Sequence, residues 1–106
     1  MPANVKRLLK ELKQGLARLY GGQLKAVYLY GSYARGDAHP DSDIDVMIVL
    51  DHYKHYADEI ERTGELVSEL SLAYGISISR VIITLKQWQN ADTPLLRNIR
   101  AEGLPA

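Results

Sequence analysis

The chain contains no cysteine among its 106 residues. This absence excludes a disulfide framework and any zinc site built on thiolates, and it fits a reducing compartment. No apolar run approaches the roughly 18 residues that a membrane-spanning helix needs. The opening "MPANVKRLLKELKQ" has no apolar signal core, and no repeat or low-complexity segment is present. We therefore expect one cytoplasmic domain over residues 1–106 that makes no membrane contact.

The formal net charge is zero, but the charges are unevenly distributed. Residues 37–69 hold ten of the thirteen acids, which argues against direct nucleic-acid binding and is compatible with a divalent cation. Residues 6–18 contain one acid, Glu11, and five bases: Lys6, Arg7, Lys10, Lys13 and Arg18. This basic segment is either a solvated helix face or a surface for an acidic partner.

Hydrophobic periodicity and turn residues predict alternating helices and strands. The expected helices cover residues 4–20, a short segment from Ser32, residues 56–74, a short segment after a Thr84–Gln87 capping box, and residues 94–102 after Thr93. The expected strands cover residues 24–30, 43–50 and 76–84, with a loop over residues 36–42. We expect a small α/β (α+β) domain in which helices cover a three-stranded mixed sheet.

Two carboxylates, Asp43 and Asp45, begin the strongest strand of the chain. Residues two apart in a strand point to the same side, so these carboxylates lie about 6–7 Å apart. Their repulsion is about 2–3 kcal/mol at an effective dielectric constant near 20. Mg²⁺ is the cation that commonly joins one or two carboxylates to the phosphates of a substrate, so we assign Asp43 and Asp45 as metal ligands.

Gly31 and Ser32 follow the preceding strand and form a second half of the same site. Glycine allows a phosphate to approach the backbone closely, and the start of a helix favours an anion. Arg35, one turn later, adds a guanidinium for the same phosphates. A phosphate-binding turn opposite a carboxylate-bound metal indicates phosphoryl or nucleotidyl transfer.

The remaining polar and aromatic candidates carry weaker signals. His39 precedes Pro40 in a loop and is typical of a solvated turn residue. No cysteine or third histidine supports His52 and His55 as metal ligands. Tyr33 could contact a nucleotide base.

The stretch "GSYARGDAHPDSDID" resembles the Gly-Ser, ten residues, Asp-x-Asp signature of the minimal nucleotidyltransferases of the DNA polymerase β superfamily. The resemblance extends over nearly the whole chain through its size, its element order and the ending "TPLLRNIRAEG". It implies the nucleotidyltransferase fold. It also implies that Gly31 and Ser32 bind the triphosphate of ATP, that Asp43 and Asp45 bind Mg²⁺ and act in catalysis, and that Arg35 occupies a basic position of the family.

The chain departs from this family at the third carboxylate, which the superfamily usually carries on the next strand. That strand reads "ISISRVIIT", and its candidate positions are Ser77 and Ser79. A serine hydroxyl is a poor substitute for an anionic metal ligand. Nucleotide binding is therefore expected to tolerate this departure better than rapid catalysis does. Asp37, Asp41 or a side chain of a partner could compensate.

The family also implies a partner. Minimal nucleotidyltransferases of this size are commonly paired with a helical HEPN toxin, an RNase with an Arg-x4–6-His motif. Only three residues separate Arg35 from His39, so this chain lacks that motif and resembles the antitoxin. Apolar faces of its first and last helices could contact the partner or a second copy.

Two functions of different classes remain open from the sequence. The first is an Mg²⁺-dependent enzyme that transfers AMP from ATP to a partner protein. The second is an antitoxin that neutralises its toxin by binding, with a weak or inactive nucleotide site, and the serines at 77 and 79 favour it. Small-molecule nucleotidyl transfer is a third option, disfavoured because no additional domain is present.

Overall fold

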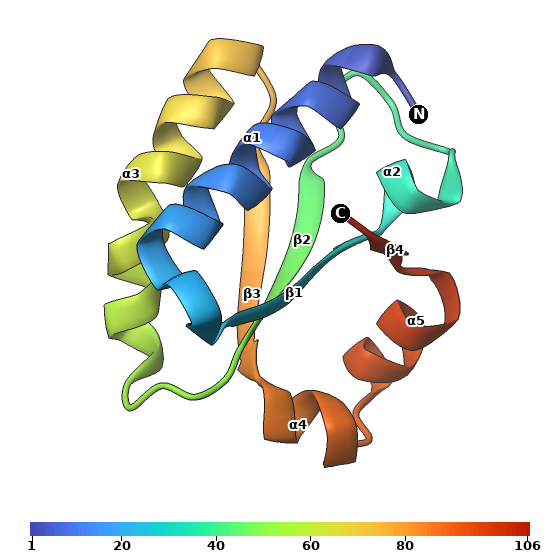
Figure 1. The fold of residues 1–106 in the computed structure, drawn as a ribbon. Coiled ribbons are helices and arrows are strands. Elements are labelled where there is room, and N and C mark those ends of the chain that lie inside the picture. The colour runs from blue at the N-terminus through green and yellow to red at the C-terminus, as the bar shows by residue number, and fades with distance from the viewer.

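Four strands form one mixed sheet in the computed structural model, which describes residues 1–106 (Figure 1). The strand order is β3-β2-β1-β4, with β1 antiparallel to both β2 and β4 and β3 parallel to β2. Their bounds are Leu24–Tyr30 for β1, Ile44–Leu50 for β2, Ile78–Thr84 for β3 and Leu104–Pro105 for β4.

The expected three-stranded sheet is wrong by one strand, because β4 pairs with β1 through Tyr28–Pro105 and Leu29–Leu104. A strand of two residues is too short to show an alternating pattern, and a proline argues against a strand in sequence reading. The strands expected from residues 43 and 76 begin instead at Ile44 and Ile78. Both aspartates therefore lie at the amino end of β2, Asp43 just before it.

The helices follow the predicted order and their ends lie close to the predicted positions. They are α1 Ala3–Tyr20, α2 Ser32–Arg35, α3 Tyr56–Tyr74, α4 Leu85–Asn90 and α5 Pro94–Glu102, with a 3-10 turn η1 at Gly21–Gln23. The predicted capping box is confirmed: Gln87 N donates to Thr84 Oγ1 at 3.2 Å and Thr84 N donates to Gln87 Oε1 at 2.9 Å. Thr93 caps α5 by accepting from Leu96 N at 3.2 Å.

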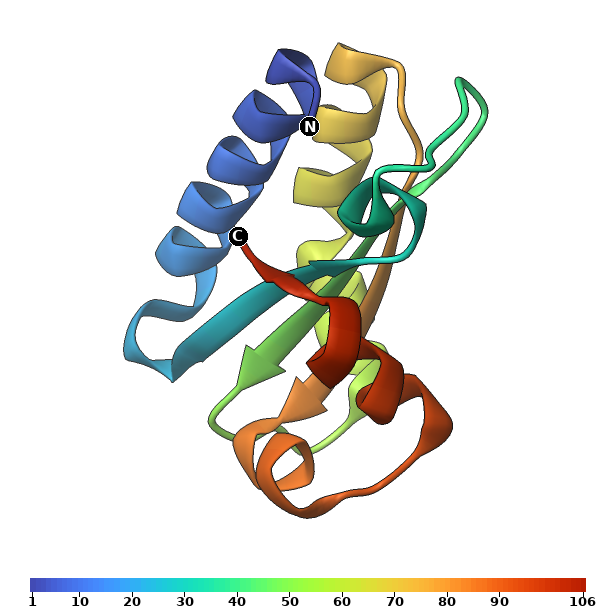
Figure 2. The ribbon, with the colours of Figure 1, turned by 90° about the vertical axis from the view of Figure 1, so that its right-hand side faces the viewer.

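Helices cover both faces of the sheet. The long helices α1 and α3 pack on one face, where their leucines and valines meet Ile44, Val46, Ile48 and Leu50 (Figures 1 and 2). On the other face, Met47 and Val49 pack with Leu96 and Ile99 of α5. β2 is therefore buried from Val46 to Leu50, whereas Asp43 is exposed and Asp45 is half-buried. No helix combines the length and the apolar character that crossing a membrane requires.

Candidate active site

Gly31 packs directly against the carboxylate of Asp45. Its backbone has φ +77° and ψ −155°, a region that essentially only glycine adopts. A methyl group at this Cα would overlap Oδ2 of Asp45. The Gly31 carbonyl accepts bonds from Ala34 N at 3.1 Å and Arg35 N at 3.0 Å, which begin α2. The turn between β1 and α2 is thus fixed against the carboxylate that the sequence singled out.

Three side chains form a row across the sheet at this end. Asp45 pairs with Tyr30 of β1 and with Ser79 of β3. Neighbouring residues in register share a face, so Tyr30, Asp45 and Ser79 project together on the face that α5 covers lower down. Tyr30 was missed from the sequence, because strand register could not be deduced there.

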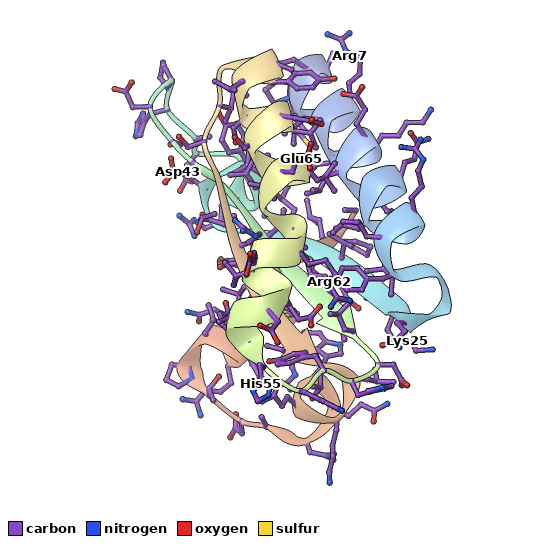
Figure 3. All side chains as sticks on the ribbon, turned by 90° about the vertical axis from the view of Figure 1, so that its left-hand side faces the viewer. Arg7, Lys25, Asp43, His55, Arg62 and Glu65 are labelled. Carbon is purple, nitrogen blue, oxygen red and sulfur yellow. The ribbon has the colours of Figure 1, made fainter.

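The two aspartates are electrostatically coupled. Burial, and then the neighbouring Asp43 carboxylate, raise the pKa of Asp45, and the Arg35 guanidinium opposes this rise. Figure 3 shows Asp43 at the edge of the molecule, where the chain enters β2. A hard cation between the carboxylates would reverse their repulsion, so this donor set fits one Mg²⁺ together with phosphate oxygens. No group of three or more histidine, aspartate or glutamate side chains has metal-binding geometry in this chain.

The two serines proposed for the missing carboxylate differ in position. Ser79 lies in β3 directly beside Asp45 and is exposed. Ser77 precedes the strand, and its carbonyl oxygen accepts a bond from Ile44 N at 2.9 Å. Ser79 is therefore the position from which a third carboxylate would face the same site.

The Arg35 guanidinium forms ion pairs with two carboxylates, those of Asp37 and Glu102. Its Nε is 3.3 Å from Asp37 Oδ2 and its Nη1 is 3.2 Å from Glu102 Oε1, while its side chain remains 46% exposed. These contacts connect α2 to the end of α5. Glu102 is 67 residues away in the sequence and gave no local signal.

Ser32 begins α2, and its hydroxyl makes no hydrogen bond within the chain, although its carbonyl accepts from Gly36 N at 3.0 Å. Of the principal cavities, none is lined by Gly31, Ser32, Asp43 or Asp45. The site is therefore an open surface, and the adjoining cavity of about 510 Å³ meets it through Arg35.

The histidines do not converge on this site. His39 N donates to Ser42 Oγ at 2.8 Å within the loop before β2. His52 and His55 line a separate cavity of about 310 Å³ at the other end of β2, beside Glu59. Figure 3 shows His55 far from Asp43 along the sheet. Tyr33 packs partly against the core beneath α2.

Comparison with known proteins supports this arrangement. Residues 9–102 match the model of the nucleotidyltransferase domain family. A provisionally named protein adenylyltransferase of Methanocaldococcus jannaschii is 35% identical over 101 residues, which cover 94% of this chain and 95% of that protein. A second such protein of the same organism is 35% identical over 71% of this chain and 75% of its own length.

Solved structures agree with the fold. A structure described as a minimal nucleotidyltransferase superposes with a TM-score of 0.67 at 21% identity, covering 100% of this chain and 97% of that one. A toxin–antitoxin structure with AMP-PNP gives a TM-score of 0.63 at 24% identity, covering 89% and 68%. A complex of tri-AMPylated Shewanella oneidensis HEPN toxin with MNT antitoxin gives 0.53 at 19%, covering 91% and 69%.

The mixed sheet with its Gly-Ser turn and paired aspartates thus defines the nucleotidyltransferase fold. The chain belongs to the nucleotidyltransferase domain family, and it is a nucleotidyltransferase. The resemblance found in the sequence is confirmed at this level.

Proposed function

We propose that this chain transfers AMP from Mg²⁺-bound ATP to a partner protein, and that the partner is a HEPN-type toxin which the chain restrains. The observation that carries the proposal is the contact of Gly31 with Asp45, because it holds the turn that we expect to bind phosphate against the carboxylate that we expect to bind the metal. The names of the relatives that are 35% identical support protein adenylylation. The toxin–antitoxin structures support the partner by likeness of fold.

Each residue has a distinct part in this reaction. Gly31 lets the triphosphate approach the backbone, and the Ser32 hydroxyl donates to a phosphate oxygen. Asp43 and Asp45 would hold Mg²⁺, which would neutralise charge on the phosphates. Arg35 leaves Asp37 and Glu102 to bind phosphate oxygens.

The transfer itself is an in-line displacement. The acceptor hydroxyl oxygen forms a bond to the α-phosphorus while the bond from that phosphorus to the bridging oxygen breaks. Pyrophosphate leaves with the electron pair, and the hydroxyl proton passes to water. The chain contributes mainly positioning and electrostatic stabilisation. Because the site is an open surface, the acceptor protein itself has to cover it.

The alternative is an antitoxin that acts by binding alone. The observation that favours it is Ser79, a neutral side chain beside Asp45 where a third carboxylate would complete a two-metal site. A chain of this kind would restrain its partner without adenylylating it.

One experiment separates the two functions. The chain is co-expressed with a HEPN-type partner, and both growth rescue and transfer of label from α-³²P-ATP are measured for wild type, Asp45→Asn and Asp92→Asn. Asp92 is an exposed aspartate paired with Arg97 and serves as the matched control. Enzymatic restraint predicts that only Asp45→Asn loses label and rescue. Rescue by Asp45→Asn without label would establish restraint by binding.

A further inference from the structure

Two adjoining cavities lie beside β4, one against α1 and the other against α2 and the loop that follows it. The first, of about 590 Å³, is lined by Leu9, Ala17 and Pro105 among others. The second, of about 510 Å³, includes Leu104 and reaches Arg35. Met1 lines both cavities, and β4 lies between them. We call this region the α1–β4 surface.

The α1–β4 surface lies on one side of the molecule and ends at the candidate active site. Figure 2 shows the two chain ends and α2 gathered on the same side, with α1 running along it. Met1 is 48% and Leu104 41% exposed, so large apolar side chains are in contact with solvent there. A protein seated on this surface would therefore extend to Arg35 and the turn at Gly31.

The rim of the first cavity is positively charged. Lys6, Lys10 and Lys13 lie along one edge of α1, at the spacing that aligns helical side chains. All three are exposed and none is paired with an acidic side chain, but Lys13 Nζ donates a hydrogen bond to Ala106 O at 2.7 Å. The only acid of α1, Glu11, accepts a hydrogen bond from the Tyr74 hydroxyl instead. The charges of Lys6 and Lys10 are therefore left for an external partner.

The shape of the surface favours a helix over a strand as the occupant. β4 has two residues, one of them Pro105, which has no N–H to offer to an added strand. From Lys6 to Ala17 the groove follows α1 for about 16 Å, the length of about three helical turns. Apolar side chains on one face of a docked helix would fill the groove, and acids beside them would reach the lysines.

We propose that the α1–β4 surface docks the acceptor protein through an amphipathic helix that carries carboxylates beside its apolar face. This inference rests on the proposed function, because it takes the occupant to be the protein that receives AMP. A second copy of the chain fits less well. Its acidic helix α3 buries Val67 and Leu70 against its own sheet, and its exposed large apolar side chains, Tyr56 and Leu72, lie near opposite ends of the helix, so they form no continuous apolar face for the groove.

The test uses two fluorescein-labelled peptides that form amphipathic helices, one with leucines and glutamates and the other with glutamine at each glutamate. Binding to the full chain is followed by anisotropy. The glutamate peptide is expected to bind about tenfold more tightly than the glutamine peptide. The triple variant Lys6→Glu, Lys10→Glu, Lys13→Glu should weaken the binding of the glutamate peptide by tenfold or more. Leu104→Ser should weaken the binding of both peptides. Lys86→Glu, an exposed position on α4, is the matched control and should change nothing.

Other results overturn the docking inference. It fails if neither peptide binds, if both bind alike, or if Lys86→Glu weakens binding as much as the triple variant does. It also fails if sedimentation shows a wild-type dimer that the triple variant loses, because a second copy then occupies the surface. The peptides should bind Asp45→Asn as they bind wild type, so failed docking is distinguishable from failed nucleotidyl transfer.

Discussion

The α-carbon of Gly31 lies so close to Oδ2 of Asp45 that no side chain fits between them. One residue belongs to the turn after β1 and the other to the paired strand β2, so a local turn and a long-range strand pairing meet at one point. In the proposed function, a phosphate bound at the turn would lie beside a carboxylate that shares a metal with it.

Gly31→Ala should destabilise the protein more than Gly36→Ala does. The Gly31 backbone conformation is confined to glycine and the new methyl would overlap Asp45, so we expect a loss of about 3 kcal/mol in unfolding free energy. Gly36→Ala is the control: Gly36 has φ +84° with open space around it, and about 1 kcal/mol should be lost. Urea unfolding measures both, and equal losses would contradict the Gly31–Asp45 contact.

Asp43→Asn should lower the pKa of Asp45. Burial and the Asp43 charge raise that pKa, and the substitution removes the second cause. Carboxyl carbon NMR over a pH titration reads Asp45 directly. An Asp45 pKa that stays the same in Asp43→Asn would show that the two carboxylates are not coupled.

Asp45→Asn should stabilise the metal-free protein at pH 7. The pKa of Asp45 is raised on folding, so its favourable contribution is present below its unfolded value and is lost as the pH rises through the folded value. Because the half-buried carboxyl keeps part of its contact with solvent, we expect a gain of only about 0.5 kcal/mol. The gain should vanish below about pH 4. Urea unfolding at both pH values checks this, and destabilisation at pH 7 would refute it.

Ser79→Asp should create the missing carboxylate. Its side chain would join Asp45 on the same face, so Mn²⁺ titration in the presence of ATP should show an additional metal per chain. Label transfer should rise by about tenfold. Ser77→Asp, which introduces the same charge before β3 begins, should add no metal. An equal response of both variants would show that a carboxylate at position 79 has no particular access to the metal site.

Glu102→Gln should strengthen nucleotide binding. Arg35 now contacts both Asp37 and Glu102, and weakening one contact makes the guanidinium more available to phosphates. The pair is partly exposed, so the dissociation constant for ATP should fall by only about two- to fivefold. Asp92→Asn, which frees the distant Arg97, should leave the dissociation constant for ATP unchanged. Weaker ATP binding by Glu102→Gln would show instead that the ion pairs of Arg35 with Asp37 and Glu102 favour nucleotide binding.

Local patterns in the sequence were enough to predict the helices and the central strands. Leucine spacing, the Thr84 capping box and the Thr93-Pro94 start each depend on neighbours within a few residues. β4 was not predictable, because two residues show no period and their pairing with β1 depends on the whole fold.

The same distinction holds for the candidate site. Asp43 and Asp45 could be predicted as site residues because two acids stand at the start of an apolar strand. The row of Tyr30, Asp45 and Ser79 needed the register between strands, and the contact of Arg35 with Glu102 needed α5 to fold back beside α2. The residues predicted from the sequence, Gly31, Ser32, Arg35, Asp43 and Asp45, all lie at this end of the sheet, and their chemical roles stay predictions.

The central claim is that Asp45 supports transfer of AMP to a partner protein. The most direct measurement is label transfer from α-³²P-ATP to a co-expressed HEPN-type partner by wild type, Asp45→Asn and the control Asp92→Asn. We predict that wild type and Asp92→Asn label the partner. The rate of labelling by Asp45→Asn should fall by about a hundredfold or more. Equal labelling by Asp45→Asn and wild type would contradict the account.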